Sequence, residues 1–330
     1  MKRHGRSHCR PQTSGRPNTG MQARCGCRQK LCGQGTLGVH ESSLGCAGQG
    51  LDTSHSGLSV KVMCMRRPLI REFRLLFFAI LGVIVPFGLL LYVFPRGTGS
   101  YWTWPIPEPR SAMLIGAAYL GAVFYYVAAL YKNDWQQVDN GLGGLILFSL
   151  VLLAATMAHW DAFKPYHPIT LVWLAFYYGG PFLAPVFYRL QIERMGAAAD
   201  EGVKLAPAVR AWLIGRGVFY AVLALVGFSF ADSIATAWPW TIQPLELRVF
   251  IGQIAIVSWG GLIAIRSRRA WPWHRLGVLL GGAIGAFQLM GLLIGSTPYQ
   301  GSSRLGAVLP LMFAEWLAVA VVLFVLYRRR

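Results

Sequence analysis

The stretch WPWTIQPLELRVFIGQIAIVSWGGLIAI, residues 238–265, joins a short Trp-Pro segment to a long apolar run that ends before Arg266. A helix needs about 20 consecutive apolar residues to cross the hydrocarbon core of a bilayer. This run has about that length, and between its start, at Arg248, and Arg266 it holds no charged residue. We therefore interpret it as a membrane-spanning helix with a Trp-Pro loop before it.

Seven other runs of the same kind occur, and the whole chain is 55% hydrophobic and only 13% charged. Soluble domains carry about 25% charged residues. Backbone groups cannot stay unpaired in lipid, so each long run must be helical. The sequence predicts an all-α membrane protein with eight transmembrane helices, at about residues 75–94, 112–131, 141–160, 169–188, 211–231, 247–265, 276–295 and 306–327.

The basic residues of the body indicate its orientation in the membrane. With the N-terminus in the cytoplasm, sixteen Lys and Arg residues after position 64 fall on the cytoplasmic side. The outer loops then hold only Arg96, Arg110, Lys164, Arg248 and Arg304. The positive-inside rule predicts a protein of the cell membrane with both termini cytoplasmic and the lipid bilayer as its partner. Because no soluble basic domain remains, we expect no nucleic-acid binding despite the net charge of +18.

Residues 1–65 differ in composition from the rest of the chain. All six cysteines lie there, together with many Arg, Gly and Ser residues and little apolar periodicity. Such a segment buries too little apolar surface to offset its ordering entropy. We expect a disordered extension or a non-native one, since Met65 opens a stretch that is typical of a membrane-protein start. Its cysteine spacing fits a structural zinc site poorly.

The Trp-Pro phrase occurs twice. A shift of 136 positions aligns Trp102 with Trp238 and Trp104 with Trp240, and both pairs follow the first span of a group of four. We interpret this as a duplicated four-helix unit, residues 66–200 and 201–330. An even number of spans per unit inserts both copies the same way up, so the repeat is parallel, unlike the inverted repeats of many transporters.

These four tryptophans allow two interpretations. Tryptophan is enriched at both membrane interfaces, where its amphipathic ring suits the headgroup region. We expect Trp102, Trp104, Trp238 and Trp240 to be interface anchors. The alternative is an aromatic lip on the outer face that contacts a ligand.

The two junctions also carry a resemblance. WPWTIQPLELRVFIG, and less closely WTWPIPEPRSAMLIG, resemble a phrase of uncharacterised bacterial integral membrane proteins, in which Trp-Pro-Trp leads through Pro and Arg into a Gly-containing helix. The match covers about a tenth of the chain, and its first copy departs from the pattern by having Met113 where the second has Arg248. The resemblance implies a bacterial multi-pass membrane protein and implies no activity.

Three polar side chains lie within predicted spans of the second half: Glu315, Gln288 and Gln253. Intramembrane polar residues are costly and mark functional sites by default. One hypothesis is that they line a cavity for a proton, a cation or a polar substrate. The other is that a protonated Glu315 bonds a neighbouring helix. We expect no charged partner for Glu315, because Arg216 lies nearer the cytoplasmic end and should snorkel to the surface.

Two further patterns have simpler interpretations. His159, Asp161 and His167 in HWDAFKPYH match no metal-binding spacing, so no metal is predicted. Gly277 and Gly281, with Gly285 one turn on, predict close helix packing.

No motif for a cofactor or a catalytic centre occurs after Met65, so we expect no cofactor and favour a protein that is not an enzyme. The function that the pattern favours is transport or permeation of a small molecule or ion. The alternatives are a membrane-embedded sensor, assembly or structural protein, and, further from the pattern, a lipid-modifying membrane enzyme.

Overall fold

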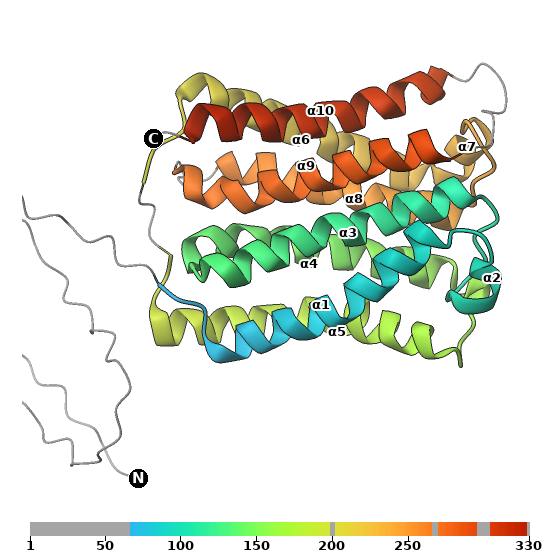
Figure 1. The fold of residues 1–330 in the computed structure, drawn as a ribbon, viewed down its shortest axis with the longest axis horizontal. Coiled ribbons are helices and arrows are strands. Elements are labelled where there is room, and N and C mark those ends of the chain that lie inside the picture. The colour runs from blue at the N-terminus through green and yellow to red at the C-terminus, as the bar shows by residue number, and fades with distance from the viewer. Residues whose placement is uncertain (1–66, 199–201, 266–269, 296–303, 329–330) are drawn as a thin grey trace, which may run out of the picture. The chain divides into compact units, whose positions relative to one another are not determined.

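The computed structural model describes residues 67–198, 202–265, 270–295 and 304–328 (Figure 1). Helices form the framework throughout these ranges, where the isolated β-bridge is between Lys204 and Ala270. The prediction for residues 1–65 lies outside the ranges.

Eight long helices are each long and apolar enough to span a membrane. They are α1 (Arg71–Val93), α3 (Pro109–Lys132), α4 (Trp135–Ala158), α5 (Pro168–Met195), α6 (Pro207–Ser229), α8 (Pro244–Leu262), α9 (Trp271–Ile294) and α10 (Arg304–Tyr327). The short elements are α2 (Thr98–Tyr101), η1 (Trp160–Ala162), α7 (Ala231–Thr236) and η2 (Ile263–Ile265). Each predicted span coincides with one long helix, with ends that differ by at most seven residues, which confirms the all-α, eight-span fold.

Proline begins four of the long helices: Pro109 in α3, Pro168 in α5, Pro207 in α6 and Pro244 in α8. The first helical residue has no intrahelical use for its N–H, so proline costs nothing there, and its fixed φ already suits a helix. The Trp-Pro loops therefore end at Pro109 and Pro244, three residues before the predicted spans at about 112 and 247.

The central helices are α3 and α8. Within the apolar 18-residue stretch of each helix, 56% of the residues are buried in α3 and 67% in α8, against 39% or less in the other six long helices. Helix α3 packs on α1 and α9, and α8 packs on α6 and α4. The outer helices α5 and α10 pack on α4 and α9 respectively. The polar groups of α3 and α8 are therefore the most enclosed, while α1, α5, α6 and α10 carry the most exposed apolar surface.

Two hydrogen bonds at the starts of α4 and α9 share one spacing. The Trp135 amide donates to the Arg67 carbonyl at 2.8 Å, and the Trp271 amide donates to the Val203 carbonyl at 2.7 Å. The two donors are 136 positions apart (271 − 135), and so are the two acceptors (203 − 67). Each bond fixes the segment before the first helix of a half to the start of that half's third long helix.

A second pair of bonds has the same spacing. The Ile70 amide donates to Gln191 Oε1 at 2.9 Å, and the Ala206 amide donates to the Tyr327 hydroxyl at 3.0 Å. Residues 206 and 327 again lie 136 positions after 70 and 191. In each half the last long helix therefore caps the start of the first.

Glycines let α6 and α8 touch through their backbones. A Cβ on Gly261 would lie 2.3 Å from the Leu213 carbonyl oxygen and 2.7 Å from the Gly217 Cα. Any side chain at Gly261 would push the helices apart. Close backbone approach of this kind is a general route to helix association in membranes.

The predicted glycine stripe of α9 is only partly a packing face. A Cβ on Gly277 would meet nothing within 4 Å, and one on Gly281 would only touch Val257 at 3.9 Å. By contrast, a Cβ on Gly285 would lie 2.7 Å from the Phe313 carbonyl oxygen, and one on Gly282 2.3 Å from the Ala320 Cβ. The close contact with α10 therefore uses Gly282 and Gly285. Residues eight apart are turned by about 80° around a helix of 3.6 residues per turn, so Gly277 lies well away from the side of α9 that Gly285 presents to α10.

Candidate functional site

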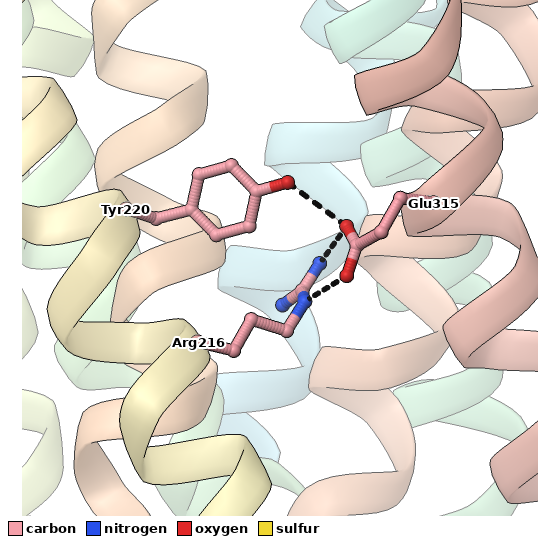
Figure 2. A network of polar contacts seen from close by, with 3 residues as sticks. All are labelled: Arg216, Tyr220 and Glu315. Carbon is pink, nitrogen blue, oxygen red and sulfur yellow. Dashed lines mark hydrogen bonds and ion pairs between the residues drawn. The ribbon is translucent and has the colours of Figure 1, made fainter.

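An ion pair joins α6 to α10 (Figure 2). Arg216 Nε donates to Glu315 Oε1 at 2.6 Å, and Nη2 donates to Oε2 at 3.0 Å. The Tyr220 hydroxyl donates to the same Oε2 at 2.9 Å. Glu315 therefore accepts three hydrogen bonds from α6, two of them in the bidentate geometry that makes Arg–carboxylate pairs strong.

The sequence of α6 places its two donors on one face. Arg216 and Tyr220 are four residues apart and so are neighbours on the helix surface. The guanidinium carbon lies 4.9 Å from the Tyr220 ring centroid, which adds a cation–π contact. The side chains of Arg216 and Glu315 are 11% and 35% exposed. Both residues lie near the middle of their helices, at about the depth of the bilayer centre.

This geometry corrects two expectations. Glu315 does have a charged partner, and Arg216 does not snorkel to the surface. An isolated charge at this depth is expensive, but opposite charges in hydrogen-bond contact offset much of each other's desolvation. Arg216 can therefore stay at mid-depth because Glu315 reaches it from the neighbouring helix.

The two glutamines form a separate contact. Gln288 Nε2 donates to Gln253 Oε1, and Gln253 Nε2 donates to the Leu114 carbonyl at 3.3 Å. Gln253 is 1% exposed and Gln288 is fully buried, so this contact links α9, α8 and α3 inside the bundle. The hydrogen bonds of Glu315 go to Arg216 and Tyr220 instead. The predicted three-residue site therefore divides into an ion pair and a buried amide pair.

The four predicted interface tryptophans are core residues. Trp102 and Trp104 are fully buried, and Trp238 and Trp240 are 8% and 2% exposed. Within each pair the rings meet edge to face, at 5.8 Å in the first and 5.6 Å in the second. A lip that contacts a ligand, or an anchor in the headgroups, would need exposed rings. The loops instead fold inward and pack their indoles between the helices.

Trp240 also ties the two central helices together. Its Nε1 donates to the Ser111 hydroxyl at 3.1 Å, which connects the loop before α8 to the first turn of α3. The Arg110 guanidinium lies 5.8 Å from the Trp240 ring centroid. These contacts place the second Trp-Pro loop against the first turn of α3, which belongs to the other half of the chain.

Three buried charged residues escaped the sequence analysis, and one of them is Asp139 of α4, which is 6% exposed. Arg110, expected in an outer loop, is 4% exposed and donates from Nη2 to the Gly295 carbonyl at 2.9 Å. Glu246 is 1% exposed in the first turn of α8. The helix dipole favours an acid at that position. A carboxylate two residues after a helix-starting proline was the available signal for Glu246.

A surface cluster links the loop after α4 to α7 and α8. Arg248 Nη1 donates to His159 Nε2 at 2.6 Å, and Nη2 donates to Asp232 Oδ2 at 2.8 Å. Arginine has no acceptor, so His159 must be the neutral tautomer with its proton on Nδ1. Burial, and then the charge of Arg248, lower the pKa of His159, while the Arg248 hydrogen bond lowers the pKa of Asp232.

His159 thus belongs to an ion cluster, and His167 caps α5 by accepting from the Ile169 amide at 3.3 Å. Across the described ranges no three His, Cys, Asp or Glu side chains gather closely enough to hold a metal ion.

Two hollows lie between outer helices. An apolar cavity of about 300 Å³ lies among α1, α3, α4 and α5, and Ile80, Ile84 and Gly180 are among its lining residues. A groove of about 500 Å³ runs between α6 and α10, with Trp212 and Glu315 in its wall. The ion pair of Figure 2 crosses the gap beside this second hollow.

Comparison with known proteins found no matching family model, no similar curated protein and no similar solved structure. The class that the fold itself defines is the multi-pass helical membrane protein, with eight helices suited to span a bilayer. Within that class, the distinguishing site is the mid-depth contact of Arg216, Tyr220 and Glu315.

Proposed function

We propose that the protein transports a small molecule or an ion across the membrane and that the Arg216–Glu315 pair is its coupling site. The observation that carries this proposal is the bidentate ion pair at the middle of two apolar helices. Ionisable residues at such depth are typical of proton relays and substrate pathways.

Stability alone is a weak reason to keep such a pair. Replacing a buried ion pair by well-packed apolar residues is often neutral or stabilising. Moreover, α6 and α10 are not among the helix pairs whose backbones pack closely, although Leu213 and Leu323 share an apolar cluster and Tyr220 meets Trp316 edge to face at 5.9 Å. Arg216 and Glu315 supply the ion pair across this gap, and such a bridge can be broken and remade without moving the closely packed helix pairs.

The chemistry of the pair supplies a coupling step. A proton on Glu315 removes its negative charge and leaves the Arg216 guanidinium free to hold an anion. Alternatively, a cation can take the place of Arg216 on the carboxylate. In both cases the loss of the bridge frees α6 and α10 to move apart along the groove between them.

The test is proton flux in reconstituted vesicles, recorded with an internal pH-sensitive dye while alkali cations and small carboxylates are added outside. The decisive variant is Arg216→Gln/Glu315→Gln, which keeps hydrogen-bonding groups and removes both charges. It should fold and lose solute-dependent proton flux. Preserved flux in this variant, or no flux from the wild-type protein with any solute, would overturn the proposal.

A matched control is available in the first half. Arg194 Nη1 bonds Glu72 Oε1 at 2.5 Å between α5 and α1, with both side chains well exposed. The variant Arg194→Gln/Glu72→Gln removes an ion pair of the same composition away from mid-depth. It should retain wild-type flux.

We further propose that residues 66–200 and 201–330 are two copies of one four-helix unit, both inserted with their termini in the cytoplasm. Four hydrogen bonds with a common spacing of 136 residues support the duplication. The distribution of basic residues supports the orientation. Reporter fusions after Arg330 test it, because only cytoplasmic reporters should be active there.

A further inference from the structure

A third hollow, of about 670 Å³, lies where α9 begins and α10 ends. Unlike the two hollows described above, it has arginines in its wall: Arg275 from α9 and Arg328 just after α10. Among the residues that the structure describes, no carboxylate lies within ion-pair distance of either guanidinium. Two positive charges therefore face one cavity, and no carboxylate in the described part of the chain pairs with either of them.

Three aromatic side chains form part of the wall and pack against one another. Trp271 stacks on Tyr327 with ring centroids 5.1 Å apart and planes at 19°, and it meets Phe324 edge to face at 5.5 Å. The Arg275 guanidinium lies 5.7 Å from the Phe324 ring centroid. The Tyr327 hydroxyl is held by the Ala206 amide at 3.0 Å. The cavity is therefore preformed, and a ligand would not have to order it.

One side of the cavity continues into apolar surface. Val325 and Val321 also line it, and they are 67% and 54% exposed along α10. Val321 is seven residues before Arg328, which corresponds to about 10 Å along a helix. The cavity thus runs from charged groups at a helix end to aliphatic side chains deeper in the membrane-spanning segment.

We propose that this cavity binds an anionic glycerophospholipid, with Arg275 and Arg328 holding the phosphate and an acyl chain lying along Val325 and Val321. Guanidinium groups bind phosphate oxygens in a fixed fork geometry, which suits a phosphate better than a point charge does. Basic pockets between helices at a membrane surface are sites of this type. The aliphatic continuation selects a lipid over free phosphate, because free phosphate would leave it uncovered.

The first half lacks this pair of charges. The positions 136 residues before Arg275 and Arg328 are Asp139 and Ile192. The inference therefore predicts one anionic lipid site, belonging to the second half, and it does not depend on whether the protein transports anything.

The test is native mass spectrometry of the full-length protein in detergent, with phosphatidylglycerol or phosphatidylcholine of the same acyl composition added at equal concentration. The wild-type protein should retain one phosphatidylglycerol more strongly than any phosphatidylcholine. Each arginine near an anionic lipid contributes about 1 kcal/mol. The variant Arg275→Gln/Arg328→Gln should therefore bind phosphatidylglycerol at least tenfold more weakly.

Two further variants keep the interpretation specific. Arg71→Gln/Arg74→Gln removes the same charge from exposed positions on α1 and should bind phosphatidylglycerol like the wild type. Val325→Trp fills the aliphatic part of the cavity, leaves both arginines in place and should also weaken binding. Equal retention of the two lipids by the wild type, or equal losses from the α1 and cavity arginine pairs, would overturn the proposal. The proposal would also be overturned if millimolar inorganic phosphate displaced the bound lipid while Val325→Trp still bound phosphatidylglycerol as strongly as the wild type.

Discussion

In the duplication that we propose, the gap between α1 and α5 corresponds to the gap between α6 and α10, but the chemistry of the two gaps is opposite. In the second half, Arg216, Tyr220 and Glu315 cross the gap with three hydrogen bonds. In the first half, the ion pair between α1 and α5 is the exposed Arg194–Glu72 contact, whereas an apolar cavity of about 300 Å³ lies beside the two helices.

The sequence shows which first-half residues stand at the positions that correspond to these three polar side chains. The positions 136 residues before Arg216, Tyr220 and Glu315 are Ile80, Ile84 and Gly179. Ile80 and Ile84 line the first-half cavity. Two isoleucines and a glycine therefore serve where the other half has three polar side chains. Among the described residues, the first half holds α1 and α5 with no ion pair at the middle of these helices, since Arg194 and Glu72 meet at an exposed position. The comparison therefore favours a functional reason for the Arg216–Glu315 pair.

The largest effect should follow from removing one partner of the pair. Glu315→Leu leaves the Arg216 guanidinium uncompensated at mid-depth. Breaking a buried ion pair in this way costs about 3 kcal/mol in the free energy of unfolding. Denaturant unfolding of the protein in detergent would measure it. The first-half change Ile80→Leu, at the position that corresponds to Arg216, should cost far less, and equal losses would contradict the comparison.

Close backbone contact should produce the next largest effect. In Gly261→Ala, the new Cβ must move away from the Leu213 carbonyl oxygen, 2.3 Å distant, and from the Gly217 backbone. Overpacking of this kind costs about 1–3 kcal/mol. Gly277→Ala is the matched control, because its Cβ would meet nothing within 4 Å, and thermal unfolding should show it equal to or above wild type.

Grafting the first half's residues into the second tests whether the two gaps are interchangeable. Arg216→Ile/Tyr220→Ile/Glu315→Gly removes both charges together, so no guanidinium is left unpaired. Its free energy of unfolding should lie within about 1 kcal/mol of wild type, since apolar replacement of an ion pair is often neutral. Solute-dependent proton flux should nevertheless be lost. A graft that unfolds as readily as Glu315→Leu would show that the gaps are not equivalent.

The surface cluster of His159, Asp232 and Arg248 contains residues of both halves. It should give a smaller effect on stability, and this effect depends on pH. The pKa of His159 is lowered in the folded protein, so the unfolded chain binds more protons near the usual pKa of 6.5. Stability is then full above that value and falls as the pH drops through the folded pKa. Because the pKa of Asp232 is also lowered, its contribution is lost only as the pH falls below its ordinary value of 3.8.

The measurement for this cluster is the melting temperature between pH 7 and pH 5. The wild-type value should fall over this interval because His159 becomes charged beside Arg248. His159→Gln should flatten the change while keeping an acceptor for the arginine. An unchanged pH dependence in this variant would assign the effect to other groups.

The eight spans could be predicted because an apolar run of bilayer length is a local property of the sequence. The helix starts at Pro109 and Pro244 were predictable for the same reason, since the backbone restriction of proline acts within one residue. These features do not depend on which helices become neighbours.

The contacts of the site do depend on neighbours, and there the sequence was insufficient. Glu315 meets Arg216 across 99 residues of sequence, and neither helix alone indicates which face the other presents. The same reason explains Trp102 and Trp104. Residue type placed them at the membrane surface, whereas the loop folds inward and buries both rings. The positions of the spans follow from composition, whereas the contacts between helices follow from packing.

The smallest effect should come from filling the first-half cavity. Ala122 is one of its lining residues, and Ala122→Leu adds three carbon atoms next to about 300 Å³ of unfilled space. Volume is available, so the free energy of unfolding should change by less than about 1 kcal/mol, below the cost of typical overpacking. Proton flux should also stay at the wild-type level, because the proposed coupling site lies in the other gap. Gly285→Ala is the stringent control. It adds a single carbon, 2.7 Å from the Phe313 carbonyl oxygen, and should destabilise more than the three carbons of Ala122→Leu. If Ala122→Leu instead abolished flux without loss of stability, the apolar gap would be part of the transport path, and the functional contrast between the two halves would fail.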